Sequence, residues 1–217
     1  MERLLEAGAD PNVRLEKTLW YLEYNFSRLS VEFAGSTPFW RAAYAQDVDA
    51  MRLLVEHGAD PTIPTKRMPE RRRRRYNDDE NEDKSGLPPV PLYGPDAQPI
   101  HAAAGIGFGE GYAGGFHRGA PDGWLPAVKY LVEELGADVN ARDANGFSPL
   151  HHAAARGDVE VIRFLVEKGA DVTLVSRRGK TTADMANSPV QRVPVYPEAL
   201  ALLESLGAVN NHDCQVC

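Results

Sequence analysis

A short phrase of leucines followed by Gly-Ala-Asp recurs along this chain of 217 residues and constrains its fold more than any other feature. Each full copy carries apolar residues and a glutamate shortly before the glycine. A phrase that recurs along one chain indicates stacked copies of one supersecondary unit, each too small to bury its own apolar face. The full copies lie at 4–10, 53–60, 131–138 and 165–171, and a fainter one lies at 202–208.

The spacing of these glycines shows where the repeat is regular. Gly136 and Gly169 lie 33 positions apart, whereas the other neighbouring pairs lie 50, 78 and 38 positions apart. Relative to a period of 33, those gaps leave inserts of 17, 45 and 5 residues. The middle gap could instead contain a degenerate repeat and a shorter insert.

A second phrase precedes each glycine phrase and predicts where helices begin. Pro38, Pro99 and Pro149 stand in the segments Thr-Pro-Phe-Trp-Arg-Ala-Ala, Gln-Pro-Ile-His-Ala-Ala-Ala and Ser-Pro-Leu-His-His-Ala-Ala, and 181–186 is a looser copy. Proline suits a first helical turn, because the missing N–H has no helical partner there. Glycine suits the left-handed residue that ends a helix. The two phrases therefore mark helix starts and helix stops.

Together with the 33-residue spacing, these phrases resemble the Thr-Pro-Leu-His-x-Ala-Ala motif and the glycine turn of the ankyrin-repeat family, as a bacterial or otherwise divergent member. The resemblance covers about two thirds of the chain. It implies an all-α ankyrin-repeat solenoid of stacked helix-turn-helix units, here with long inter-repeat insertions, that binds another protein. The family's concave face implies partner-binding roles for Trp40, Arg41, Tyr44, His152 and Arg156.

We expect a single ankyrin-repeat domain over 1–217. Its parts are a truncated first repeat (1–12), an aromatic insertion (13–36), a repeat (37–60), a charged and proline-rich loop (61–98), a repeat with a glycine-rich insertion (99–138, insertion 105–123), a repeat (139–171), a C-terminal repeat (172–210) and a Cys-x-x-Cys tail (211–217). Residues 1–5 align with 50–54, so the chain is expected to begin inside a second helix. The sequence therefore gives no information on the compartment.

Composition excludes several classes of protein. The hydrophobic fraction of 43% suffices for a core, and no apolar run reaches the length of a membrane span. The formal net charge of −7 makes nucleic acid an unlikely partner, because nucleic-acid binding requires a basic surface. The negative net charge is instead compatible with a protein partner that presents a basic face.

The aromatic insertion is the leading candidate for partner contact. Leu29, Val31 and Phe33 alternate with polar residues as in a half-buried strand. Aromatic side chains with polar tips are enriched at binding hot spots, and the sequence supplies Trp20, Tyr21, Tyr24 and Phe26 just before. The alternative is that these rings form a satellite core beneath the insertion.

The charged loop contains the arginine run 71–75, a cluster of acidic residues and the stretch Pro88-Pro89-Val90-Pro91. Such a segment is too charged and too poor in apolar residues to collapse, so we expect it to be mobile and solvated. The arginines could contact phosphates or act as a nuclear address, but acidic residues follow at once.

The glycine-rich insertion formally matches a dinucleotide fingerprint over 109–114. That motif requires a preceding strand within a βαβ unit, and here a helix precedes it, so the match is rejected. The loop could wrap over a ligand with Phe108, Tyr112, Phe116 and His117, or it could be a packed structural loop.

The histidines give no catalytic constellation, and the chain is not expected to be an enzyme. His101 and His151 occupy the family's Thr-Pro-Leu-His position, where the ring resembles a hydrogen-bonding strut to the adjacent turn.

The tail holds the only two cysteines, in His212-Asp213-Cys214-Gln215-Val216-Cys217. His212, Cys214 and Cys217 could hold Zn²⁺ or Cu⁺ with a further donor, because thiolate and imidazole suit both metals. A terminal disulfide or a frayed reduced tail is the alternative.

Three functions follow. The first is a non-catalytic scaffold that binds another protein through the turns, the aromatic insertion and the concave face. The second is a metal-binding or redox protein that uses the tail, alone or together with His117. The third is self-assembly into a homo-oligomer or filament through an open repeat edge.

Overall fold

The computed structural model describes residues 1–16, 31, 33–69, 83–108, 123–190 and 193–215. Within these ranges every regular element is a helix, so the fold is all-α. In chain order the helices are α1 (Glu2–Glu6), α2 (Pro38–Ala45), α3 (Val48–Glu56), α4 (Pro99–Ala104), α5 (Leu125–Lys129), the π-helical turn η3 (Tyr130–Glu134), α6 (Pro149–Ala155), α7 (Val159–Glu167), α8 (Thr182–Ala186) and α9 (Pro197–Ser205).

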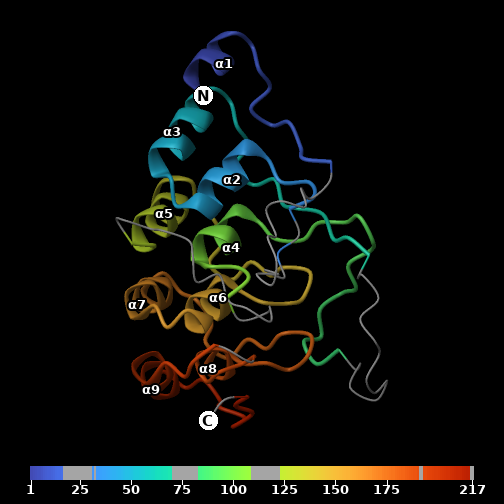
Figure 1. Cartoon of the computed structure of the whole chain (residues 1–217). Helices are drawn as coiled ribbons and strands as arrows, with labels where there is room; N and C mark the ends of the chain where they lie inside the picture. The colour runs from blue at the N-terminus through green and yellow to red at the C-terminus, as the bar shows by residue number, and fades with distance from the viewer. Residues whose placement is uncertain (17–30, 32, 70–82, 109–122, 191–192, 216–217) are drawn as a thin grey trace.

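The helices lie in two rows (Figure 1). In the first row α2 contacts α4, α4 contacts α6, and α6 contacts α8. In the second row α5 contacts α7, and α7 contacts α9, while α2 packs on α3, α6 on α7 and α8 on α9. Arg52 of α3 reaches η3, where it pairs with Glu134 and lies 4.3 Å from the ring centroid of Tyr130. Each unit is therefore a helix pair that packs on its neighbours.

The core lies between the two rows and follows the phrases of the sequence. Alanines of the first helices are fully buried, which lets neighbouring first helices approach closely, as Ala43, Ala103 and Ala154 show. In α3, η3, α7 and α9 one leucine of the phrase is buried at 1% exposure or less, as Leu54 and Leu165 show. Burying a leucine contributes about 1.5–3 kcal/mol, so each of these four leucines stabilises its unit.

The glycine phrases end the second helices as predicted. In every unit the alanine amide of Gly-Ala donates a hydrogen bond back to the carbonyl of a phrase leucine, as from Ala59 to Leu54 and from Ala170 to Leu165, both 2.9 Å. The intervening Gly58 and Gly169 have φ of 86° and 92°. Only glycine adopts this left-handed conformation without steric cost, so this residue stops each helix.

The phrase at 131–138 holds one residue more than the others, and the structure shows where it goes. Leu54 and Leu165 each lie four positions before their glycine, whereas Leu131 lies five before Gly136. The helix widens into the π-turn η3 over these residues, and Ala137 still donates to the Leu131 carbonyl at 2.9 Å. A π-turn absorbs a single inserted residue without displacing the helix that follows.

The helix starts are also confirmed. Pro38, Pro99 and Pro149 are the first residues of α2, α4 and α6. The Thr37 hydroxyl accepts the amide of Trp40 at 3.1 Å and so satisfies one of the free donors of the first turn.

The structure describes the ends of the three predicted insertions, and one expectation about them is wrong. The glycine-rich insertion separates α4 from α5 within one unit. The charged loop was expected to be mobile and solvated, yet its described part 83–98 is hydrogen-bonded to the repeats, because two arginines hold it through its main chain. Charge alone predicted disorder, since the arginine partners lie elsewhere in the sequence.

At the N-terminal end, α1 buries none of its residues, and Met1 and Leu4 are 53% and 67% exposed. Leu5 packs partly against the core. Across the described residues, the structure contains no helix whose length and apolar character would allow it to cross a membrane.

Candidate partner-binding edge

Four turns follow one another along one edge of the molecule, and their bases are built alike. We name them turn 1 (15–36), turn 2 (65–97), turn 3 (143–147) and turn 4 (176–180). The first amide of each turn donates to the carbonyl of its last residue, and the first carbonyl accepts the amide of the last residue but one. The first of these bonds are Leu15 to Ser36 (2.9 Å), Thr65 to Ala97 (2.9 Å), Asp143 to Phe147 (3.0 Å) and Ser176 to Lys180 (2.9 Å).

Two arginines connect neighbouring turns: Arg14 connects turn 1 to turn 2, and Arg142 connects turn 3 to turn 4. The Arg14 guanidinium donates to the carbonyl of Gly35 at 2.9 Å and to that of Pro64. Arg142 makes the equivalent bonds to Gly146, at 2.8 Å, and to Val175. Gly35 and Gly146 have φ of 81° and 80°, and a Cβ on Gly146 would lie 3.0 Å from the amide of the next turn. Turns 1 and 2 are thereby joined, and so are turns 3 and 4.

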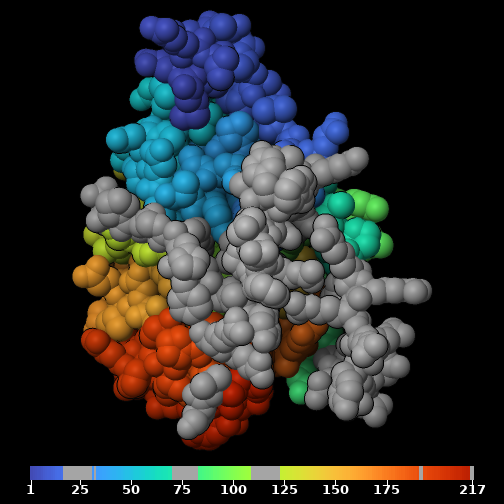
Figure 2. All heavy atoms as spheres, in the orientation of Figure 1, coloured from blue at the N-terminus to red at the C-terminus, as the bar shows by residue number. Residues whose placement is uncertain are grey.

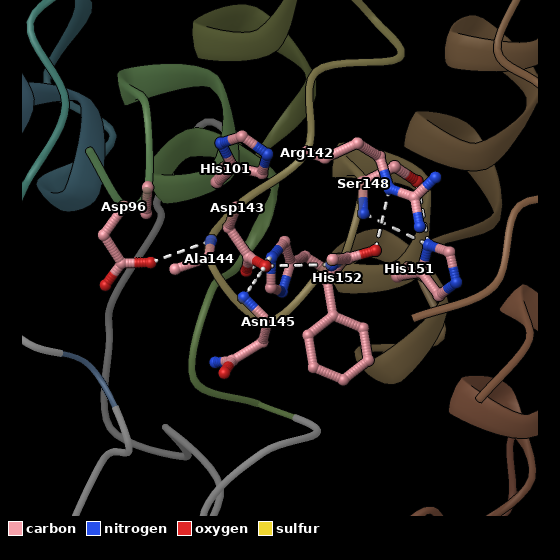
Figure 3. Close-up of polar contacts among 12 residues, drawn as sticks. Asp96, His101, Arg142, Asp143, Ala144, Asn145, Ser148, His151 and His152 are labelled. Carbon is pink, nitrogen blue, oxygen red and sulfur yellow. Dashed lines mark hydrogen bonds and ion pairs between the residues drawn. The ribbon is translucent and has the colours of Figure 1, made fainter. Parts of the chain in front are cut away.

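Turn 2 is joined to turn 3 by a carboxylate. Asp96, near the end of turn 2, accepts the amide of Ala144 at 3.1 Å (Figure 3). The row of turns is therefore continuous over the described residues.

Behind turn 3 lies a buried polar cluster (Figure 3). Asp143 accepts the amides of Asn145 at 2.9 Å and Phe147 at 2.8 Å through one carboxylate oxygen, and its other oxygen lies 3.2 Å from Nε2 of His152. Both side chains are at most 1% exposed. Burial raises the pKa of Asp143, although the nearby His101 ring opposes the shift. This cluster fixes the conformation of turn 3.

The two histidines of the helix-start phrase act as struts, as predicted. Nδ1 of His101 accepts the amide of Gln98 at 3.0 Å, and Nε2 lies 3.0 Å from the Ala141 carbonyl of the next unit. His151 bonds to Ser148 in the same way and reaches the Lys180 carbonyl at 3.2 Å. Burial lowers the pKa of His101 to about 4 and that of His151 to about 3. Both rings are therefore neutral at pH 7 and hold neighbouring units together.

The aromatic residues predicted at the concave face are buried rather than exposed. Trp40 is 0% and Tyr44 is 7% exposed, and their rings stack 5.4 Å apart. Phe33, from the end of turn 1, meets both rings edge-on, and Trp40 also donates to the Ala97 carbonyl at 2.9 Å. The expectation of an open surface at these two residues is wrong, because the end of the insertion packs on them.

The apolar residues at the described end of this insertion are buried. Val31 and Phe33 are 3% and 2% exposed, as the alternating pattern predicted. The proposed hot-spot residues lie outside the described part of the chain, so their role stays a prediction. They are Trp20, Tyr21, Tyr24 and Phe26.

The charged and histidine candidates are also engaged within the chain. The Arg41 guanidinium lies 4.4 Å from the Phe33 ring centroid. Arg156 donates to the Ala104 carbonyl at 3.0 Å and lies 3.6 Å from the ring centroid of Trp124, so it holds the two ends of the glycine-rich insertion. His152 is 0% exposed, and its expected place on an open face is wrong because turn 3 covers it with Asp143.

The C-terminal tail is docked over its described residues. Asn211 donates its amide to Asp184 at 2.8 Å, and Gln215 donates its amide to the Ser188 carbonyl at 2.9 Å. These bonds overturn the expectation of a frayed tail for 209–215. Cys214 is disulfide-bonded, while Cys217 lies outside the described residues. Within the described ranges no group of three His, Cys, Asp or Glu side chains is placed to hold a metal ion. The metal proposal for His212, Cys214 and Cys217 therefore stays untested.

Sequence reasoning missed the residues that join the turns. Arg14 and Arg142 each lie six positions after a phrase glycine. Lys66 and Arg177, whose amides donate to carbonyls of the preceding turn, each lie eight after one. Aligning the units on their glycines would have revealed both pairs. Asp96 gave no such signal, because its partner Ala144 lies 48 positions away and contributes only a backbone amide.

Comparison with known proteins identifies the repeats. Family models for the ankyrin repeat match residues 34–66 and 116–166, so the chain contains ankyrin repeats. These spans cover the unit of α2 and α3 and the helices from α5 to α7.

The relatives are larger or only partly matched. Alpha-latrocrustotoxin-Lt1a of Latrodectus tredecimguttatus is 28% identical over 79% of this chain, which spans 8% of the toxin. Protein phosphatase 1 regulatory subunit 12A of Mus musculus is 36% identical over 34% of the chain and 7% of the relative. Protein phosphatase 1 regulatory subunit 27 of Homo sapiens is 33% identical over 41% of the chain and 53% of the relative. These animal proteins give no support to a bacterial-type repeat. The repeats and the regulatory subunits among the relatives point to protein–protein interaction.

Proposed function

We propose that the chain is a non-catalytic scaffold that binds another protein along the row of turns. The continuity of this row is the observation that supports the proposal most strongly. Each turn has the same hydrogen-bonded base, and both long turns project from the same edge as the short ones. A rigid scaffold that carries variable loops at one edge is the arrangement that binding proteins use.

In this proposal the helix pairs form an ankyrin solenoid whose turns and concave face meet the partner. The aromatic insertion supplies Trp20, Tyr21, Tyr24 and Phe26 as contact residues. The names of two relatives describe regulatory subunits, which act on another protein, and this agrees with a binding role. No enzymatic role is proposed, because His101 and His151 bond to main-chain carbonyls and His152 is buried against Asp143 behind turn 3.

Site-specific photocross-linking tests the edge. A photoreactive phenylalanine is placed at Asn145 and at Arg178, the exposed tips of turns 3 and 4, and at Glu160 and Arg163 on the outer face of α7 as matched controls. After irradiation in an extract of the native cells, a specific protein adduct from the turn positions is expected. An adduct from the α7 positions alone would contradict the proposal.

The aromatic insertion is tested separately. Replacing Trp20, Tyr24 and Phe26 with alanine should weaken partner capture and leave the helical circular-dichroism signal largely intact. If the helical signal collapses instead, these rings are core residues.

A redox role for the tail is a second proposal, supported by the disulfide-bonded Cys214, and metal binding by the same cysteines would require their reduced form. Reduced protein with and without 212–217 is incubated with Zn²⁺ or Cu⁺ and analysed for metal. Stoichiometric metal that is lost on truncation would support this role, and equal metal content in both would exclude it.

A further inference from the structure

Turn 4 is a basic loop in an acidic protein. Its five residues include Arg177, Arg178 and Lys180, whereas the whole chain has a formal net charge of −7. Arg178 is exposed and projects from the tip, while the Arg177 side chain is only 19% exposed. What covers Arg177 is a segment of the second insertion, 83–91, which we name the strap. In Figure 2 green atoms of the strap lie beside the orange atoms of turn 4.

Arg177 holds the strap through its main chain and one acid. Its guanidinium pairs with the Asp83 carboxylate and donates to the carbonyls of Leu87 at 3.2 Å and Pro88 at 2.7 Å. Its Nε donates to the Ala144 carbonyl of turn 3 at 2.8 Å, which fixes the guanidinium plane. Its own carbonyl accepts the amide of Lys84 at 2.9 Å. One arginine thus organises a binding surface across two turns.

Two glycines leave room for the strap. A Cβ on Gly179 of turn 4 would lie 2.7 Å from Cδ of Lys84, and a Cβ on Gly146 of turn 3 would lie 3.4 Å from Cδ1 of Leu87. The strap therefore lies close against the backbone of both turns.

The sequence of the strap keeps it extended. A residue before proline is disfavoured in the α region, and proline fixes its own φ, so Pro88, Pro89 and Pro91 hold 87–91 in an extended conformation. A second arginine, Arg67, donates to the Val90 carbonyl. Because these bonds use backbone carbonyls, the surface selects extended chain and one carboxylate rather than a particular side-chain sequence.

We propose that turns 3 and 4 form a docking site for an extended peptide of a partner protein, with an acidic residue four or five positions before a proline-fixed stretch, and that the strap is its internal occupant. This inference rests on the proposed function, since it assumes that the partner meets the row of turns. The occupant is argued from charge and shape. The turn is basic, and the segment seated on it has an acid at Asp83 and carbonyls at Leu87 and Pro88 on Arg177.

A partner peptide must displace the strap to bind. The strap is part of the same chain, and tethered segments of this length reach effective concentrations of about millimolar. The apparent affinity of an external peptide falls by the fraction of molecules in which the site is open. The intact chain should therefore bind such a peptide more weakly than a chain whose strap has been removed.

The test uses the full chain and a fluorescein-labelled synthetic peptide with the sequence of 83–91. In the first variant 83–91 is replaced by a glycine-serine linker of equal length. Fluorescence anisotropy should show binding to this variant at least about tenfold tighter than to the unmodified chain. Adding Arg177→Gln should weaken binding to the variant about tenfold or more, whereas the matched substitution Arg178→Gln at the exposed neighbour should change it about twofold or less.

A peptide carrying Asp83→Asn should bind the linker variant more weakly than the native peptide, because it loses the carboxylate partner of Arg177. Absence of binding to a linker variant that retains its helical signal and melting temperature would overturn the inference. Equal binding to the linker variant, the unmodified chain and the Arg177→Gln variant would also overturn it. Neither result would affect cross-linking from the turns, so the proposed function can fail or stand independently.

A second variant covers the case in which the linker variant does not fold. Lys84→Pro removes the amide that donates to Arg177 and keeps the length of the chain. It should raise peptide binding above that of the unmodified chain by several fold. Unchanged binding together with unchanged hydrogen exchange at Leu87 would show that the strap is a fixed part of the fold and would reject a displaceable occupant.

Discussion

Turns 1 and 2 differ from turns 3 and 4 at their tips but not at their bases. The first two span 22 and 33 residues, and the last two span five residues each. All four close with the same pair of backbone hydrogen bonds. Lengthening a turn from five to 33 residues costs only about 2 kcal/mol of closure entropy. The base therefore determines the geometry of the repeat, and the tip is free to vary.

The two long turns are also anchored by different chemistry. Turn 1 ends in Phe33, which packs against Trp40 and Tyr44 in the core. The described part of turn 2 is held by the guanidinium groups of Arg67 and Arg177 on main-chain carbonyls. An apolar anchor is part of the fold, whereas a polar anchor on the surface can be exchanged for another polypeptide.

The largest change in unfolding free energy is expected when the ring that anchors the end of turn 1 is removed. Trp40→Ala should lower the free energy of unfolding by about 3–5 kcal/mol, because it leaves a cavity beneath Phe33. Urea denaturation measures the change. Tyr93→Ala, at a residue that is 61% exposed on turn 2, is the control and should change stability by less than about 0.5 kcal/mol. A cost at Trp40 no larger than that at Tyr93 would show that Phe33 is not anchored on a buried core ring.

Low pH should destabilise the contacts between units that His101 and His151 make. His101 and His151 have folded-state pKa values of about 4 and about 3, below the unfolded value of 6.5. The unfolded chain therefore binds protons that the folded chain rejects, and stability is lost as the pH falls below about 6.5. Asp143 acts in the opposite direction, because its raised pKa favours proton uptake by the folded chain.

We expect a net loss of about 2–3 kcal/mol between pH 7 and pH 5, measured by urea denaturation at each pH. A variant carrying His101→Asn and His151→Asn should show a flatter pH dependence. If stability stays constant over this range in the unmodified chain, the two rings are not buried in neutral form.

The equivalence of long and short turns is tested at their arginines. Arg14→Ala and Arg142→Ala each remove two bonds to backbone carbonyls, and each should cost about 1–3 kcal/mol of unfolding free energy. Arg163→Ala on the exposed face of α7 serves as control. A cost at Arg142 without one at Arg14 would show that the insertion has weakened the base of turn 1.

The smallest expected effect concerns the asparagines that follow the glycine phrase. Asn12→Ala should cost about 1 kcal/mol, because the side chain donates to the Gly58 carbonyl at 3.0 Å and accepts the Asp60 amide at 2.7 Å. Asn140→Ala should cost the same, since Asn140 bonds to Gly169 and Asp171 at 3.0 and 2.8 Å. Thermal unfolding of the two variants, with Val13→Ala at a residue that is 57% exposed as the reference, measures both effects.

The sequence predicted those parts of the molecule whose cause is local. The phrase glycines located the helix ends, the prolines located the helix starts, and the family position of His101 and His151 gave their strut role. Predictions failed where the partner was distant. Trp40 was assigned to the concave face, and its hydrogen-bond partner, the Ala97 carbonyl, lies 57 positions away. The strap was assigned to solvent because Arg177 lies 94 positions from Asp83.

The hydrogen bonds of the asparagines affect which units separate first when the molecule is stretched. Asn12 ties the first unit to the second, and Asn140 ties the third unit to the fourth, but the equivalent position between the second and third units holds Thr62, whose hydroxyl donates to its own Asp60 at 2.6 Å. Contacts between units set the order of opening in a linear array. Between the fourth and fifth units Thr173 likewise donates to its own Asp171 at 2.6 Å, so under a stretching force the molecule should part at one of these two junctions before the two that carry an asparagine.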